Sequence, residues 1–391
     1  MSKRLWIRAG TLITPRTSCQ QVTILVEEDR IAGLWPGAAP APCPGEPVLD
    51  ADGQFVGPGF VDLHVHGGGG FDTMDATTEA VLGLAAFHAR HGSTSLLPST
   101  VAASDEEIHA ALAAVEEAMG TDSPGARVLG AHVEGPFLSH GKRGAHAARH
   151  VRPPNRERDT WLFEHQAAIR RLTLAPELPG ALELIRQLRQ MGILVSLGHS
   201  AADEALVAEA ILAGAGHVTH LFNAMSTLGK VGAVRRLGLA EVALVRDDLT
   251  VEVIADGFHF PLALLPLVVR AKGAEGVALV TDAMRAAGLP DGRYTLGEMM
   301  VTVQGGMAIS DEGGLAGSIA TMDQLLRNAV QRAGQPLARA WQMASLTPAR
   351  ILSAADHLGE VAVGKTADLV ILDPALQVVA TLVGGQVVYR R

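Results

Sequence analysis

The sequence predicts an α/β protein in which a (β/α)8 TIM-like barrel is joined to a small β-sandwich domain formed by both chain termini. Three observations predict this fold. Apolar, strand-like runs alternate with helix-length segments between residues 57 and 355, which favours parallel strands covered by helices. Side chains that bind metals stand at the ends of several runs, where barrels of this type gather their active sites. Glycine-punctuated β segments occur near both ends of the chain.

The predicted sandwich is built from two segments far apart in the sequence, residues 1–56 and 356–391. The first reads as short strands separated by turns, with a linker rich in proline, glycine and alanine at 36–47. We expect the two segments to pair in one domain. In the second segment, the β-forming runs are 359–364, 367–373 and 378–388.

The predicted barrel domain takes residues 57–355. Its apolar runs number about eight, as a (β/α)8 barrel requires. After the last run, the glycine-rich region 285–317 carries candidate strands at 294–296 and 299–303, so we expect a loop and hairpin insertion there. The predicted barrel strands are 60–66, 94–98, 128–134, 172–176, 193–198, 217–220, 250–255 and 277–281.

Composition excludes several classes of partner. The chain has 391 residues, 48% of them hydrophobic and 19% charged, with a formal net charge of -9 and a pI of about 5.9. Binding to nucleic acid or to an anionic membrane needs a dense basic face, which this balance does not supply. The two cysteines, Cys19 and Cys43, lie away from the metal-binding residues and suit a reducing compartment. With no predicted signal peptide or membrane span, we expect a cytoplasmic protein.

The most informative motif is Gly-Phe-Val-Asp-Leu-His-Val-His-Gly at 59–67. In a strand, His64 and His66 project from the same side, as metal ligands do. Four further candidate ligands stand at or just after the ends of other apolar runs. They are Glu134, His199, His220 and Asp282.

Nitrogen and carboxylate ligands of this kind suit a divalent metal, zinc first, with iron, manganese or cobalt as alternatives. Glu134 could bridge two ions, with the histidine pair 64 and 66 on one and His199 and His220 on the other. A single ion held by Glu134, His199 and His220 is the other interpretation. The number of ions, one or two per subunit, stays open at this point.

The chain resembles the N-acetylglucosamine-6-phosphate deacetylases of the amidohydrolase superfamily over nearly its whole length. Other amidohydrolases use a carboxylated lysine as the bridge between two metals, and no lysine occurs on the run at 172–177 where that residue is expected. The matching strings are Pro-Gly-Phe-Val-Asp-Leu-His-Val-His-Gly at 58–67, His-Val-Glu-Gly-Pro-Phe at 132–137, Gly-His-Ser at 198–200, Thr-His-Leu-Phe-Asn-Ala-Met at 219–225, Ala-Asp-Gly-Phe-His at 255–259 and Thr-Asp-Ala-Met at 281–284.

The resemblance implies a metal-dependent hydrolase that converts N-acetylglucosamine 6-phosphate into glucosamine 6-phosphate and acetate. It assigns Asp282 as the general base, which could also be a metal ligand, and His146 as a donor to the acetyl carbonyl. A solvated loop histidine is the alternative for His146. His132 is expected to orient a ligand rather than bind metal. Residues that the resemblance assigns to the substrate are His146, Asn223, Ala224, His259 and Leu315.

One loop departs from the pattern of the resembled family. That family carries Arg-Glu-Pro-Gly after Asn-Ala-Met, and its arginine reaches the phosphate in a neighbouring subunit. Here the loop at 226–238 is longer and lacks that proline. Arg235 is the best match to the arginine, with Lys230 and Arg236 as rivals, and we expect a homodimer.

Two other functions are alternatives, and the altered loop keeps the first of them open. The substrate could be another N-acetyl amino sugar, such as N-acetylgalactosamine 6-phosphate, or an unphosphorylated N-acyl compound. A non-catalytic amidohydrolase-like protein is the remaining alternative, although such a protein would be expected to have lost ligands, and none is missing here.

Overall fold

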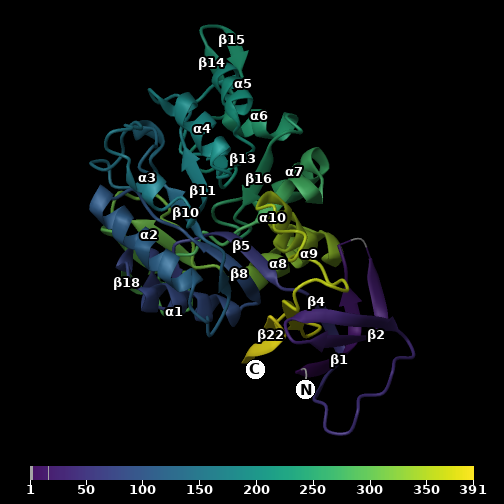
Figure 1. Ribbon diagram of the computed structural model, residues 1–391. Helices are drawn as coiled ribbons and strands as arrows, with labels where there is room; N and C mark the ends of the chain where they lie inside the picture. Colours follow the sequence, from purple (N-terminus) through teal and green to yellow (C-terminus); the bar gives the residue numbers. More distant parts are fainter. Residues whose placement is uncertain (1–2, 16) are drawn as a thin grey trace.

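The computed structural model describes residues 3–15 and 17–391 and contains the predicted barrel and terminal sheet (Figure 1). Parallel strands pair in the order β5-β8-β9 and β10-β11-β12-β13-β16-β17. Bridges from Ser99 to His132 and from Val65 to Ala283 join the two sets, so that they close into a barrel. The barrel strands are β5 (Phe60–Val65), β8 (Ser93–Pro98), β9 (Arg127–Val128), β10 (Ala131–Glu134), β11 (Ile169–Leu174), β12 (Leu194–Leu197), β13 (His217–Val218), β16 (Thr250–Val253) and β17 (Val277–Leu279).

Helices follow the barrel strands and cover them with apolar faces, which form one continuous buried core with the strands. As a consequence of this covering, all six residues of strand β5 are buried. The helices are α1 (Thr78–Ala89), α2 (Asp105–Met119), α3 (Trp161–Glu164), α4 (Ala181–Gln190), α5 (Glu204–Ala213), α6 (Leu239–Val245), α7 (Leu265–Lys272), α8 (Met322–Arg327), α9 (Leu337–Ala344) and α10 (Leu346–Ile351).

The two ends of the chain share one seven-stranded sheet, ordered β23-β22-β21-β4-β1-β2-β3. Figure 1 shows its purple N-terminal strands beside the yellow C-terminal ones, to one side of the barrel. The N-terminal and C-terminal segments pair directly in this sheet, because Leu369 on β21 is the partner of Pro58 on β4. The strands are β1 (Arg4–Ile13), β2 (Ser18–Glu27), β3 (Arg30–Pro36), β4 (Val48–Pro58), β21 (Leu369–Leu372), β22 (Val378–Val383) and β23 (Gln386–Arg390).

Several details differ from the sequence prediction. The predicted runs at 128–134 and 378–388 are each divided into two strands, β9 and β10 in the first and β22 and β23 in the second. The expected β segment at 359–364 is wrong, because Gly359 and Gly364 adopt φ of +79° and +90° and the backbone turns instead of extending. The insertion after the barrel contains one strand more than the sequence predicted. Its antiparallel strands are β18 (Gly292–Leu296), β19 (Met299–Gln304) and β20 (Met307–Ser310).

The loop that departs from the resembled family forms a short antiparallel hairpin, β14 (Gly229–Val231) and β15 (Val234–Arg236). It projects from the barrel at the top of Figure 1, far from the terminal sheet. Within 3–15 and 17–391, no helix combines the length and the apolar character that a bilayer span requires.

Candidate metal centre and active site

The site lies at the C-terminal ends of the barrel strands, where the sequence predicts it. His64 lies on β5 and His66 directly follows its last residue, and the alternation of the extended chain points both side chains to the same side. Glu134 is the last residue of β10. His199, His220 and Asp282 follow β12, β13 and β17 by two or three residues.

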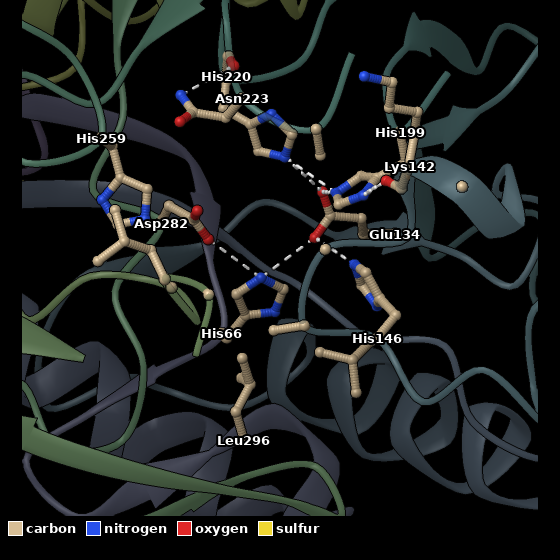
Figure 2. Close-up of a pocket in the computed structure, with 18 residues that line it drawn as sticks. His66, Glu134, Lys142, His146, His199, His220, Asn223, His259, Asp282 and Leu296 are labelled. Atoms are coloured by element: carbon tan, nitrogen blue, oxygen red, sulfur yellow. Dashed lines mark hydrogen bonds and ion pairs between the residues drawn. The ribbon is translucent and has the colours of Figure 1, made fainter. Parts of the chain in front are cut away.

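Glu134 is the centre of the cluster. Its Oε2 lies 3.2 Å from the Nε2 atoms of His64 and His66. Its Oε1 lies 3.2 Å from the Nε2 atoms of His199 and His220. The carboxylate of Asp282 approaches the first pair, with Oδ1 3.2 Å from His66 Nε2. Figure 2 shows the ring of His66 between the two carboxylates.

The other ring nitrogens decide which protons these histidines carry. Nδ1 of His66 lies 3.1 Å from the carbonyl oxygen of Ser99, and Nδ1 of His199 lies 2.8 Å from that of Lys142. A carbonyl oxygen only accepts, so both Nδ1 atoms donate, and in the neutral form of each ring, which is the form that binds a metal, Nε2 carries a lone pair. Nδ1 of His64 faces a carboxylate oxygen of Glu252 in the same way.

In the neutral rings, the Nε2 lone pairs of His64, His66 and His199 therefore converge in the middle of the cluster, where Nε2 of His220 also lies. Nε2 of His64 lies 3.2 Å from Nε2 of His66, and Nε2 of His199 lies 3.0 Å from Nε2 of His220. Lone pairs that converge on a buried carboxylate repel one another unless a cation stands among them. The donor set thus fits one or two divalent ions.

The carboxylates attract positive charge to this buried site. Although burial lowers it, the pKa of His66 rises to about 9 because Asp282 and Glu134 lie against the ring. Burial raises the pKa of Asp282, but His64 and His66 outweigh that effect and bring it to about 2. The site thus favours a cation, and protons compete with a metal for it as pH falls.

The backbone is strained at three of these positions. His199, His220 and Asp282 have φ of 48°, 29° and 48°, in the left-handed region that disfavours residues other than glycine. Such conformations cost about 1 to 3 kcal/mol each and persist where the surroundings enforce them. Their clustering at one end of the barrel indicates that side-chain placement in the site outweighs local backbone preference.

A pocket of about 430 Å³ opens over the cluster. His146 stands on one side of Glu134 and His259 beside Asp282 on the other (Figure 2). Nδ1 of His146 accepts the backbone N–H of Ala102 at 3.0 Å. Burial lowers the pKa of His146 to about 3, with a further contribution from His199, so the ring is neutral and its proton is on Nε2, facing Glu134.

His259 differs from His146 in charge. Its Nδ1 lies 2.8 Å from Oδ2 of Asp256, whose Oδ1 accepts the backbone N–H of His259. Burial alone would lower the pKa of His259, but the bond to Asp256 raises it. The ring therefore carries more positive charge near neutral pH than an isolated imidazole does.

This chain is similar to known proteins over most or all of its length. The model of the amidohydrolase family matches residues 55–388. The N-acetylglucosamine-6-phosphate deacetylase of Bacillus subtilis is 35% identical over 100% of this chain and 98% of the relative. This chain belongs to the N-acetylglucosamine-6-phosphate deacetylase family of the amidohydrolases.

Two further relatives extend the comparison. The N-acetylgalactosamine-6-phosphate deacetylase of Escherichia coli O157:H7 is 40% identical over 87% of this chain and 89% of the relative. A mutant N-acetyl-D-glucosamine-6-phosphate deacetylase of Mycobacterium smegmatis, solved with N-acetyl-D-glucosamine 6-phosphate, has a TM-score of 0.91 and 34% identity, covering 99% of each chain. The family thus includes proteins named for two epimeric sugars.

Most residues that the sequence assigned to the site line this amidohydrolase pocket. His64 lies beneath it, fully buried. Arg235 is not among the lining residues and lies on the exposed hairpin. The predicted residues that line the pocket are His66, Glu134, His146, His199, His220, Asn223, Ala224, His259, Asp282 and Leu315.

Sequence reasoning did not single out several residues at or under the pocket, among them three charged ones. Lys142 lines the pocket, and its amine points away from Glu134 in Figure 2. Arg171 on β11 and Glu252 on β16 are fully buried beneath the metal centre. The sequence signal for Arg171 and Glu252 was a charged residue inside an otherwise apolar strand. Such a residue can be buried when it pairs with a residue of opposite charge.

Proposed function

We propose that this protein hydrolyses the N-acetyl amide of N-acetylglucosamine 6-phosphate, releasing acetate and glucosamine 6-phosphate. The observation that carries this proposal is the convergence of four histidine Nε2 atoms on the buried Glu134 carboxylate. Full-length relatives named for this activity support the substrate.

Glu134, His199 and His220 would hold the main ion, and His64 and His66 a second one, with zinc as the first expectation. When bound, such an ion polarises the amide carbonyl and lowers the pKa of water toward ~7. The distances among the donor atoms support both the one-ion and the two-ion arrangement, so metal content decides between them.

The chain's own residues move the protons. As water adds to the acetyl carbon, the Asp282 carboxylate accepts a proton from it. Nε2–H of His146 donates a hydrogen bond to the acetyl oxygen as negative charge develops there. When the C–N bond breaks, Asp282 returns the proton to the sugar nitrogen, which leaves as an amine.

Replacing His146 by alanine tests its role as the donor. We expect kcat to fall by ~10²- to 10³-fold with little change in KM, as when other oxyanion donors are removed. The matched control is His150→Ala in the same loop, because His150 lies 3.5 Å from Glu298 outside the pocket. An equal fall in kcat for both variants would mean that the loop, rather than the donor, matters.

His259 is proposed to receive the phosphate, together with Asn223 and the backbone at Ala224. Because the pKa of His259 is raised, its positive charge is present at low pH and is lost as pH rises through that pKa. We therefore expect KM for the phosphorylated sugar to rise with pH. His259→Asn should raise KM and remove this rise, and a pH profile of KM unchanged in that variant would contradict the role.

The oligomeric state is proposed to be a homodimer in which Arg235 reaches the phosphate bound by the neighbouring subunit. Support comes from the exposed position of β15, outside the chain's own pocket. We expect a dimeric mass by light scattering, and Arg235→Ala should raise KM for the phosphorylated sugar alone. Lys230→Ala and Arg236→Ala test the two rival positions, and a rise in KM confined to either of them would move the phosphate contact to that residue. A monomeric mass in an active preparation would count against the dimer.

N-Acetylgalactosamine 6-phosphate is the second candidate substrate, since a relative named for it is 40% identical to this chain. Acetate release from the two epimers under equal conditions distinguishes the candidates. A higher kcat/KM for the glucosamine derivative supports the first proposal. A higher value for the galactosamine derivative replaces it and keeps the same chemistry.

A further inference from the structure

Beneath the metal centre, the barrel interior holds an ion pair between Arg171 on β11 and Glu252 on β16. Both side chains are fully buried. Most barrels of this kind fill the interior with branched apolar side chains, because an unpaired charge there would be costly. A buried pair gives little net stability, so its presence directly under the candidate ligands calls for another explanation.

Arg171 is held by hydrogen bonds to several strands at once. Its Nε donates to Ser196 Oγ at 2.8 Å, and one Nη donates to Thr219 Oγ1 at 2.8 Å. The other Nη donates to the carbonyl oxygen of Leu63 at 3.1 Å and to Oε1 of Glu252. The guanidinium is thus fixed in one orientation, and it fixes the carboxylate in turn.

The second oxygen of Glu252 faces the metal centre. Its Oε2 accepts the backbone N–H of His220 at 3.2 Å and lies 3.5 Å from Nδ1 of His64. These two residues belong to the two halves of the candidate ligand set. Oε1 of Glu252 accepts from Arg171 and Oε2 accepts from the backbone N–H of His220, so both oxygens are acceptors.

We propose that Glu252, oriented by Arg171, is a positioning residue that holds His64 and His220 in place as ligands of the metal centre. Accepting from Nδ1 of His64 leaves the Nε2 lone pair directed toward Glu134. Accepting from the His220 backbone supports a residue whose φ of 29° is unfavourable. This inference rests on the proposed metal-dependent function and extends it to residues that touch neither metal nor substrate.

Glutamine is the informative substitution at this position. The carboxylate accepts on both sides, whereas an amide accepts on one side and donates on the other. In Glu252→Gln, the NH2 group must face either the guanidinium of Arg171 or the N–H groups of His64 and His220. In both cases donor meets donor, with almost no change in side-chain volume.

Asp368→Asn is a matched control in a part of the fold remote from the metal centre. Asp368 is also buried, pairs with Arg127 at 2.6 Å, and accepts the backbone N–H of Gly384 at 2.7 Å on its other oxygen. The same donor conflict therefore arises there, between the barrel and the terminal sheet. Any general cost of replacing a buried, arginine-paired carboxylate appears in both variants.

The experiment loads wild type, Glu252→Gln and Asp368→Asn with Zn²⁺ and removes it with increasing chelator. Zinc content is measured by mass spectrometry of the metal, and Tm is measured on the zinc-free proteins. We expect Tm to fall in both variants, but only Glu252→Gln to release zinc at ~10- to 100-fold lower chelator concentration, as changes in groups that orient ligands do.

Zinc retention in Glu252→Gln equal to that in Asp368→Asn would overturn the inference and leave the ion pair a structural feature. If Glu252→Gln does not fold, Glu252→Asp decides, because it keeps the charge beside Arg171 but withdraws the carboxylate from His64. A folded Glu252→Asp variant that retains zinc as well as the wild type does would also overturn the inference. A wild-type protein that takes up no zinc would contradict the proposed function itself, and this inference with it.

Discussion

Replacing Asp282 by asparagine should lower kcat by ~10²- to 10⁴-fold, the range that a general base contributes, while most of the bound metal is retained. The substitution keeps the size of the side chain but removes the proton acceptor. Asp282 contacts His64 and His66, whereas Glu134, His199 and His220 lie 3.0 to 3.2 Å from one another. Initial rates and metal content, measured on the same preparation, check both parts of this expectation.

The two measurements also separate the alternatives for Asp282. A fall in kcat at full metal content supports the role of base. A parallel loss of metal and activity would mean that Asp282 acts as a ligand, which its approach to His66 at 3.2 Å would also allow. Activity close to that of the wild type at full metal content would contradict both roles.

Glu134→Gln should abolish both metal binding and activity. Glu134 carries the buried negative charge on which four imidazoles converge, and an amide removes that charge and places an NH2 group against two of them. We expect a loss of metal affinity larger than the ~10- to 100-fold that changes in the outer shell cost. Metal content after dialysis and acetate release are the measurements.

A buried carboxylate outside the metal centre supplies the control. Asp323 pairs with Arg327 at 2.7 Å and with His91 at 3.2 Å. Asp323→Asn should destabilise the fold without changing metal content per folded molecule. If Glu134→Gln keeps the metal and turns over substrate, the bridging position assigned to Glu134 is wrong.

The barrel could be predicted from the sequence because its signals are local. Apolar runs, alternation around His64 and His66, and polar residues at run ends follow from strand periodicity alone. The pairing of the two chain ends was also predictable, since both segments are β-rich and neither could bury its apolar face alone. The prediction failed at 359–364, where two glycines with positive φ turn the chain.

The buried charges could not be predicted from the sequence in the same way. Arg171 and Glu252 are 81 residues apart, and their pairing depends on how the strands close around the barrel axis. A charged residue in an apolar strand can equally mark an edge facing solvent. The orientation of the hairpin that carries Arg235 depends on the tertiary fold as well, because its loop shares little with the pattern of the resembled family.

Metal-dependent deacetylation is measured as acetate release from N-acetylglucosamine 6-phosphate. Zinc-loaded enzyme, chelator-treated enzyme and enzyme with zinc restored are compared with Asp282→Asn. We predict one acetate for each glucosamine 6-phosphate formed, with activity lost on chelation, regained with zinc and nearly absent in the variant. If the zinc-loaded wild-type enzyme releases no acetate, or if chelation leaves the release unchanged, the protein is not a metal-dependent deacetylase of this sugar.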